Sequence, residues 1–282
     1  MKRPVILYFA FFSCALLILA GARSQAAQRE TGRVGCPHCK NDGSEASQLL
    51  QRADALFAGF QAGEALKLLL RVLELHPDHH EALSKIARAY MDFGDMIAES
   101  EANWQEKKLK QYHIAEEYAR KAVKADPNGT WGHFYTAASL GKIAILSAVA
   151  TQIDLAEEIR TEVERAIALD PQNGFAYHVY GVWQRRMAEI GQMRRFLAST
   201  LLWRSVPKGS METSVEYLKR AVALNPTVIS HYLELAKSYI AMRRWELARP
   251  SLKSAVAFPI QFSDDPAHKK EAEQLLREIK ER

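Results

Sequence analysis

The chain has 282 residues, of which 48% are hydrophobic and 25% are charged, a composition typical of a folded globular protein and not of a disordered one. Its formal charge is +5, but three of those charges come from Lys2, Arg3 and Arg23 in residues 1–26, which hold no acid, so the rest carries +2. A surplus this small gives no support for a nucleic-acid partner.

Residues 1–26 have the pattern of a secretory signal peptide. Two basic residues precede an apolar run of 16 residues from Val5 to Ala20, and small residues then lead to a cleavage position after Ala26. The alternative is an uncleaved membrane anchor, although the apolar run is short for the roughly 30 Å of a bilayer core. We therefore expect an exported protein that is periplasmic or otherwise associated with the cell envelope.

Residues 27–44 are polar and show no periodicity, which indicates a flexible linker. The linker contains Cys36 and Cys39 in a Cys-Pro-His-Cys sequence. Thiol–disulfide enzymes use this spacing at a helix N-terminus after a strand, but no strand precedes it here. A zinc site would need two further ligands that the sequence does not place. We interpret the pair as a local disulfide or thiol pair, and keep a redox or metal role as the alternative.

From residue 45 to the end, at residue 282, apolar residues recur every three or four positions in paired segments, which predicts amphipathic helices. Prolines at 77, 127, 171, 226 and 259 end successive pairs, because proline blocks helix continuation. Only the last interval matches the spacing of about 34 residues of the tetratricopeptide repeat, and the others are longer. The sequence predicts an all-α, irregular tetratricopeptide-like array, a right-handed superhelix of antiparallel helix pairs.

Within this array the longer repeats predict additional features. In the second repeat we expect Gly94-Asp95 to break the first helix, and a long second helix to run from about Met96 to Ala125. In the third repeat we expect an insertion around residues 146–155.

Residues 229–259 form the most regular repeat. Two series of apolar residues flank a short polar turn at residues 242–244. Small residues, Ala236 and Ala248, fall where the two helices must approach each other. After Pro259, an acidic start followed by Pro266 predicts a last helix over residues 266–279, which would cover the open end of the array.

The segment from Tyr180 to Ser214 resembles the insertion found in the regulator of microtubule dynamics protein family. It runs from Gly181-Val182-Trp183 through Arg194-Arg195 to Val206-Pro207. Two further pieces are similar to that family, the one from Gly132 to Lys142 and the one from His268 to Ala272. The resemblance covers roughly residues 45–280. It implies an all-helical, tetratricopeptide-like binding module, and it implies microtubule, mitochondrial, membrane-contact or lipid roles for the eukaryotic members.

The first helix of each pair is expected to line a concave groove. Counting along the repeats places a cation on this surface in four successive pairs, together with two other side chains; the groove candidates are Arg88, Tyr135, Lys142, His178, Arg185 and Lys237. Arginine holds carboxylates and phosphates through paired hydrogen bonds. The pattern therefore predicts an anionic ligand, such as an acidic peptide end or a lipid headgroup. In the alternative interpretation these cations pair with Asp92, Glu81 or Glu234.

The remaining features give weaker indications. Residues 184–210 are basic and carry an apolar stripe, which fits either packing against the neighbouring repeat or a helix at a membrane surface. His76, His79 and His80 surround Pro77, and we interpret them as surface residues. We find no phosphate-binding loop and no catalytic motif.

These observations together predict a non-enzymatic protein-interaction scaffold without a cofactor or metal. Its protein partner is not identified by the sequence, and anionic lipid is the alternative ligand.

Overall fold

The computed structural model describes residues 44–191 and 206–282. Residues 1–26, Cys36, Cys39 and most of the insertion that follows Glu189 lie outside the described residues, and the predictions made for them stay predictions. The described residues form eleven helices and no strand, which confirms the all-α prediction. The helices are α1 (Glu45–Ala58), α2 (Ala62–Leu75), α3 (His80–Met96), α4 (Trp104–Ala125), α5 (Thr130–Leu146), α6 (Val149–Leu169), α7 (Gly174–Glu189), α9 (Met211–Leu224), α10 (Ile229–Ala241), α11 (Trp245–Ala257) and α12 (Asp265–Glu278).

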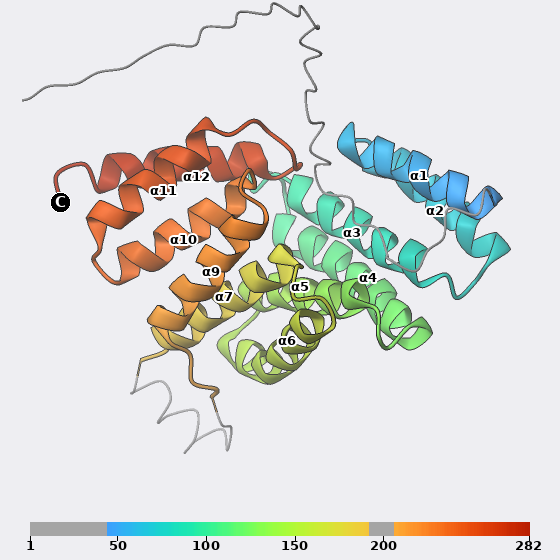
Figure 1. Ribbon diagram of the computed structural model, residues 1–282, viewed down its shortest axis with the longest axis horizontal. Coiled ribbons are helices and arrows are strands. Elements are labelled where there is room, and N and C mark those ends of the chain that lie inside the picture. The colour runs from blue at the N-terminus through green and yellow to red at the C-terminus, as the bar shows by residue number, and fades with distance from the viewer. Residues whose placement is uncertain (1–43, 192–205) are drawn as a thin grey trace, which may run out of the picture. The chain divides into compact units, whose positions relative to one another are not determined.

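The helices pack as antiparallel pairs in chain order, and the pairs stack side by side (Figure 1). The pairs are α1 with α2, α3 with α4, α5 with α6, α7 with α9, and α10 with α11. The first helices of neighbouring pairs also touch one another, α3 with α5, α5 with α7, and α7 with α10. We call the five first helices, α1, α3, α5, α7 and α10, the inner wall.

Small residues allow the helices to approach closely. Ala236 and Ala248 of the last pair are fully buried, as the sequence predicted. Gly181 of α7 lies against α9, where an added Cβ would be 2.6 Å from Leu218 Cγ. A larger side chain at these positions would force the helices apart, because protein interiors leave no spare volume.

The prediction of a helix break at Gly94 is wrong. Helix α3 continues to Met96, and Gly94 is buried inside it. An added Cβ at Gly94 would lie 2.3 Å from Cε1 of Tyr112, which comes from α4. The glycine therefore makes room for an aromatic ring of the partner helix. The turn follows at residues 97–103, and α4 begins only at Trp104, after Asn103 adopts a left-handed conformation with φ 57°.

The insertion predicted in the third repeat is also not a separate element. Helix α5 ends at Leu146, and α6 begins at Val149 after a short connection. Most of the extra length of the second and third repeats lies in their helices, with 17 and 22 residues in α3 and α4 and 17 and 21 residues in α5 and α6; the second repeat also has the connection at residues 97–103. The repeats are therefore lengthened by additional helical turns.

The C-terminal end folds back over the array. Residues 258–264, which we call the strap, leave α11 and lead into α12 without forming a helix. Helix α12 packs on α10 and α11, close to the range predicted from the sequence (Figure 1). The predicted cover of the last pair is thus confirmed, and the strap brings further residues onto the inner wall.

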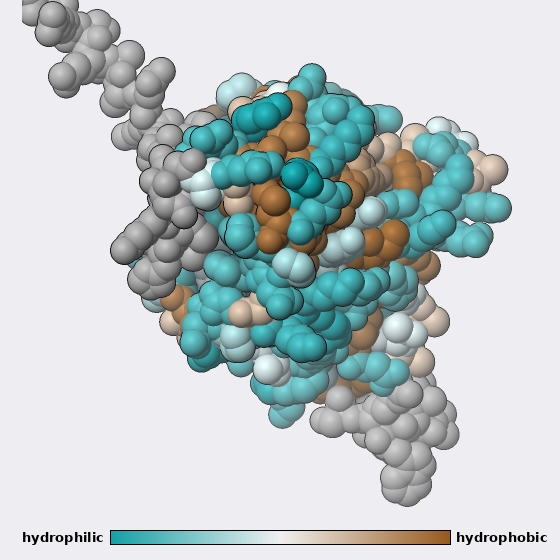
Figure 2. Space-filling view, turned by 90° about the vertical axis from the view of Figure 1, so that its right-hand side faces the viewer, coloured by the Kyte–Doolittle hydropathy of each residue, from teal (hydrophilic) through white to brown (hydrophobic). Residues whose placement is uncertain are grey.

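The surface is largely polar, with local apolar areas. Figure 2 views the molecule from the side where α1 and α2 lie in Figure 1, and it shows apolar surface gathered among polar surroundings. Large apolar side chains that are more than a third exposed include Phe60, Leu70 and Met96. Within residues 44–191 and 206–282, none of the helices has the length and apolar character needed to cross a membrane.

Candidate functional site

The predicted groove residues all lie on the inner wall, but not in one cluster. Arg88 is on α3, Tyr135 and Lys142 are on α5, His178 and Arg185 are on α7, and Lys237 is on α10. The structure groups them by the acids and rings that they contact. Arg88 and Lys142 face the strap, Arg185 and Lys237 share an acid, and His178 pairs with another histidine.

Arg88 and Lys142 each hold an acid of α3 and also contact the strap. The guanidinium of Arg88 lies 3.9 Å from Asp92, with its carbon 4.3 Å from the ring centroid of Phe57 and 5.9 Å from that of Phe262. The Nζ atom of Lys142 donates a 2.6 Å hydrogen bond to Asp95 and lies 4.0 Å from Asp264. These two cations therefore join the second and third pairs to the C-terminal segment.

Glu234 of α10 connects three helices through two cations. It forms an ion pair with Arg185 of α7, and it accepts a 2.8 Å hydrogen bond from Lys237, which also lies 2.8 Å from Glu271 of α12. Burial alone would raise the pKa of Glu234, but Lys237 and Arg185 outweigh burial and hold this pKa well below its ordinary value. Glu234 is thus ionised, and two of the predicted groove cations are already neutralised.

The sequence interpretation missed a buried lysine at the start of the wall. Lys85 of α3 is 1% exposed and forms ion pairs with Asp54 of α1 and, at 3.1 Å, with Glu81. The four-residue spacing from Glu81 to Lys85 is a signal that the sequence contains. The contact with Asp54 has no such signal, because it joins two different repeats.

His178 and Tyr135 are held in apolar surroundings. The Nδ1 atoms of His178 and His231 lie 3.1 Å apart, and His231 is fully buried. Burial lowers the pKa of His178 to about 4, so this pair is neutral at physiological pH. Tyr135 is 6% exposed and packs edge-to-face on Phe134, with the two ring centroids 4.8 Å apart. Both residues support the packing of the wall.

The histidines around Pro77 lie at the turn before α3. His79 is its N-cap residue, because Nδ1 accepts a hydrogen bond from the backbone N–H of Ala82. The rings of His79 and His80 stack with centroids 6.1 Å apart, and His76 is exposed. The three histidines are therefore explained by their position in the turn that begins α3.

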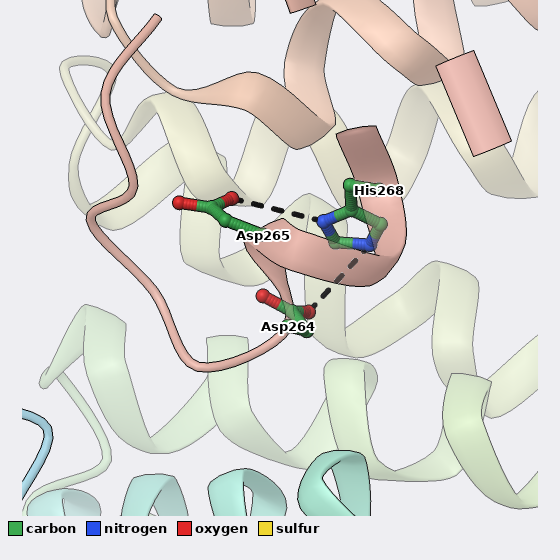
Figure 3. Close-up of side chains that lie close together, drawn as sticks. All are labelled: Asp264, Asp265 and His268. Carbon is green, nitrogen blue, oxygen red and sulfur yellow. Dashed lines mark ion pairs between the residues drawn. The ribbon is translucent and has the colours of Figure 1, made fainter. Parts of the chain in front are cut away.

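The first turn of α12 contains a compact group of two acids and a histidine. Figure 3 shows the imidazole of His268 facing both Asp264 and Asp265. The ion-pair distances are 3.6 Å to Asp264 and 3.8 Å to Asp265. Carboxylates and imidazole are metal-ligand types, and their ligand atoms lie within 4.8 Å of one another. However, Asp264 already faces Lys142. The second oxygen of Asp265 accepts the N–H groups of Gln261 and Phe262, at 2.7 Å and 2.9 Å, which fixes the strap to α12.

Asp92 is the most strongly perturbed acid beneath the strap. Burial is the main cause, and the nearby Asp95 and Asp264 add to it, so that the pKa of Asp92 rises to about 7 despite Arg88 and Lys142. The folded protein with the strap in place therefore keeps a proton on Asp92 that the unfolded chain releases near pH 4. The contribution of Asp92 to the free energy of unfolding is therefore most favourable at low pH. It is lost as the pH rises toward 7, because the folded protein must then give up a proton that it binds more tightly than the unfolded chain does.

We expect Asp92→Asn to remove this pH dependence. Between pH 5 and pH 7.5 the free energy of unfolding of the natural chain should fall relative to that of the variant by about 2 kcal/mol. Urea unfolding at both pH values, followed by circular dichroism, measures this difference. The exposed Glu117→Gln variant serves as the control and should follow the natural chain. A constant difference between Asp92→Asn and the natural chain across this range would contradict the assignment.

A small hollow lies beside the strap. Its lining comes from the end of α1 and the start of α2, from α3, and from the strap; the residues are Phe57, Phe60, Ala62, Arg88, Asp92, Met96, Gln261, Phe262 and Ser263. Phe60 is 48% exposed and Met96 is 61% exposed, so apolar surface borders the place where the strap meets the wall. The site can thus offer a ligand both cations and apolar contacts.

The chain is similar to proteins of one family along nearly all of its described length. The family described as "Regulator of microtubule dynamics protein 1-3" matches residues 49–280. Regulator of microtubule dynamics protein 1 of Bos taurus is 29% identical over 234 residues, which cover 83% of this chain and 72% of that protein. The protein of the same name from Mus musculus is 26% identical over 234 residues, covering 83% and 74% respectively.

Among solved structures, the fold is similar to that of a thermophilic TPR protein from Thermus thermophilus. The TM-score is 0.57 at 18% sequence identity, and the match covers 82% of this chain and 99% of that one. At this identity the likeness concerns the fold, and it agrees with the stacked helix pairs described above.

Proposed function

The chain belongs to the regulator of microtubule dynamics protein family, and on that premise we propose that it is a non-catalytic scaffold that binds an acidic peptide segment of a protein partner along its inner wall. The family and the fold are those of helical protein-interaction scaffolds. Lys142, Arg185 and Lys237 are engaged in ion pairs with Asp95 and Glu234, which supports a structural and binding role for the wall over a catalytic one.

One observation carries this proposal. An irregular segment of the chain, the strap, already lies against the inner wall, with an acid facing Lys142 and an aromatic ring over Arg88. The wall therefore accommodates a peptide of this chemistry without a change in the helices. Repeat arrays of stacked helix pairs commonly use such a surface for extended ligands.

The N-terminal sequence supports a proposal for the location of the partner. The names of the relatives refer to microtubules, whereas residues 1–26 predict export. We therefore propose that this chain and its partner are in the cell envelope. We also propose that the chain shares with the family the role of a binding scaffold but not a contact with microtubules.

Site-specific photocrosslinking in the native cell tests the proposal. A photoreactive amino acid is placed at Met91 of α3 or Ile240 of α10, both on the inner wall, and at the exposed Glu117 of α4 or Glu216 of α9 as matched outer positions. We expect a protein adduct from the inner positions only, because the partner contacts the first helices. Adducts confined to Glu117 and Glu216, or no adduct from any position, would overturn the proposal.

A further inference from the structure

The strap is seated on the wall in the way that a bound peptide would be. The ring of Phe262 lies 5.8 Å from that of Phe175 on α7 and also faces Arg88 on α3. Two residues later, Asp264 faces Lys142 on α5 at 4.0 Å. A short segment thus contacts three wall helices through one aromatic side chain and one carboxylate.

Two features oppose this seating. The hydroxyl of Ser263 is buried and has no hydrogen-bond partner among the described residues, which is unfavourable relative to its hydration in solvent. The strap also brings Asp264 close to acids of α3, and burial together with Asp95 raises the pKa of Asp264 above its ordinary value. Both effects end when the strap leaves the wall, so they favour its release.

The wall next to the strap offers contacts that the strap does not use. Phe60 and Met96 border the hollow beside Phe262 and remain largely exposed. A ligand with an additional apolar residue could cover them and gain hydrophobic contact that the strap lacks. Such a ligand can bind the wall more tightly than residues 258–264 do.

We infer that the strap is an internal competitor for the binding surface. It occupies the place of a partner peptide that presents an aromatic side chain two residues before a carboxylate, as Phe262 and Asp264 do. This inference rests on the proposed function, and it adds the chemistry of the ligand and the regulation of its access. The partner binds when it displaces the strap from Arg88 and Lys142.

Tethering makes the strap an effective competitor despite its imperfect seating. It is connected to α11 at one end and to α12 at the other, so its local concentration at the wall is on the order of millimolar. A free peptide of the same sequence should therefore bind weakly to the natural chain. A substitution that weakens the contacts between the strap and the wall should therefore increase the affinity of the wall for the free peptide.

Fluorescence anisotropy with a labelled synthetic peptide tests this competition. The probe has the sequence of residues 258–267 and is titrated with the natural full chain and with the double variant Phe262→Ala/Asp264→Asn. We expect the double variant to bind the probe roughly tenfold or more tightly than the natural chain. The matched control is Ile260→Ala, an exposed strap residue that should leave the affinity unchanged. A second probe that itself carries Phe262→Ala and Asp264→Asn should bind no chain.

Hydrogen exchange on the natural chain provides an independent measurement, which does not depend on how the double variant folds. The backbone N–H groups of Gln261 and Phe262 are protected by the carboxylate of Asp265. An excess of the unlabelled probe should accelerate their exchange severalfold, because displacement of the strap brings water to the Asp265 carboxylate, which is 1% exposed in the folded protein, and loosens these local hydrogen bonds.

Equal probe affinity for the natural chain and the double variant would overturn the inference, as would exchange that the probe leaves unchanged. If crosslinks nevertheless formed from Met91 and Ile240 in cells, the wall would bind its partner without competition from the strap. If the probe displaced the strap but cellular crosslinks came only from the outer positions, the proposed function would fail instead.

Discussion

Replacing Glu234 with alanine is expected to lower the free energy of unfolding by about 3–5 kcal/mol. Glu234 compensates Arg185, whose side chain is only 6% exposed, across the contact between α7 and α10. Without this acid, the buried guanidinium of Arg185 keeps one carboxylate partner among residues 44–191 and 206–282, namely Glu189, which lies at 3.1 Å and is 37% exposed. Urea unfolding at pH 7, followed by circular dichroism, measures the loss.

Two further variants make this test specific. Glu157→Ala removes the partner of Arg160, but both side chains are more than a third exposed, so the loss should stay below about 1 kcal/mol. The double variant Arg185→Met/Glu234→Leu removes both buried charges and should recover much of the stability lost by Glu234→Ala. A loss from Glu234→Ala as small as that from Glu157→Ala would show that the contact is not a structural ion pair.

Replacing Trp183 with alanine should destabilise the chain by a similar amount, about 3–5 kcal/mol. Trp183 is 5% exposed, packs against Tyr180 with ring centroids 5.7 Å apart, and donates a 2.8 Å hydrogen bond from Nε1 to the carbonyl of Ala156 on α6. The substitution removes a large apolar group and leaves a cavity between α6 and α7. Thermal and urea unfolding would both report it.

The contributions of volume and hydrogen bonding can be separated at this position. Trp183→Phe keeps most of the apolar contact but leaves the buried carbonyl of Ala156 unpaired, so a loss of about 1–2 kcal/mol is expected. Trp104→Ala is the control, because this partly exposed ring at the start of α4 belongs to none of the core clusters of the described residues and lies 5.3 Å from Nζ of Lys108; its loss should cost less than about 1 kcal/mol. Equal effects of Trp183→Ala and Trp104→Ala would contradict the assigned packing.

The helices could be predicted because each one must bury an apolar stripe whose period is visible in the sequence. The pairing of α10 with α11, their turn at residues 242–244 and the buried Ala236 and Ala248 follow from that pattern. Gly94 was interpreted wrongly for a physical reason. Local propensity treats glycine as a helix breaker, but the presence of Tyr112 on the facing helix makes glycine the residue that fits.

The candidate site was only partly predictable for a related reason. Repeat positions correctly assign Arg88, Lys142, Arg185 and Lys237 to the first helices, and whether they bind a ligand stays a prediction. Two of these cations also contact acids from outside the last repeat, because Lys142 faces Asp264 and Lys237 faces Glu271. The return of that segment to α3 and α5 depends on contacts between residues far apart in the sequence, which helical periodicity does not encode.

The return of the strap to α3 also has a consequence for how the protein is made. A chain emerging from the ribosome completes α3, α5 and α7 long before residues 258–264 exist. During that interval Arg88 and Lys142 have neither Phe262 nor Asp264 against them. On the competition proposed above, an acidic segment nearby would therefore meet a surface that nothing covers until residues 258–264 have been made.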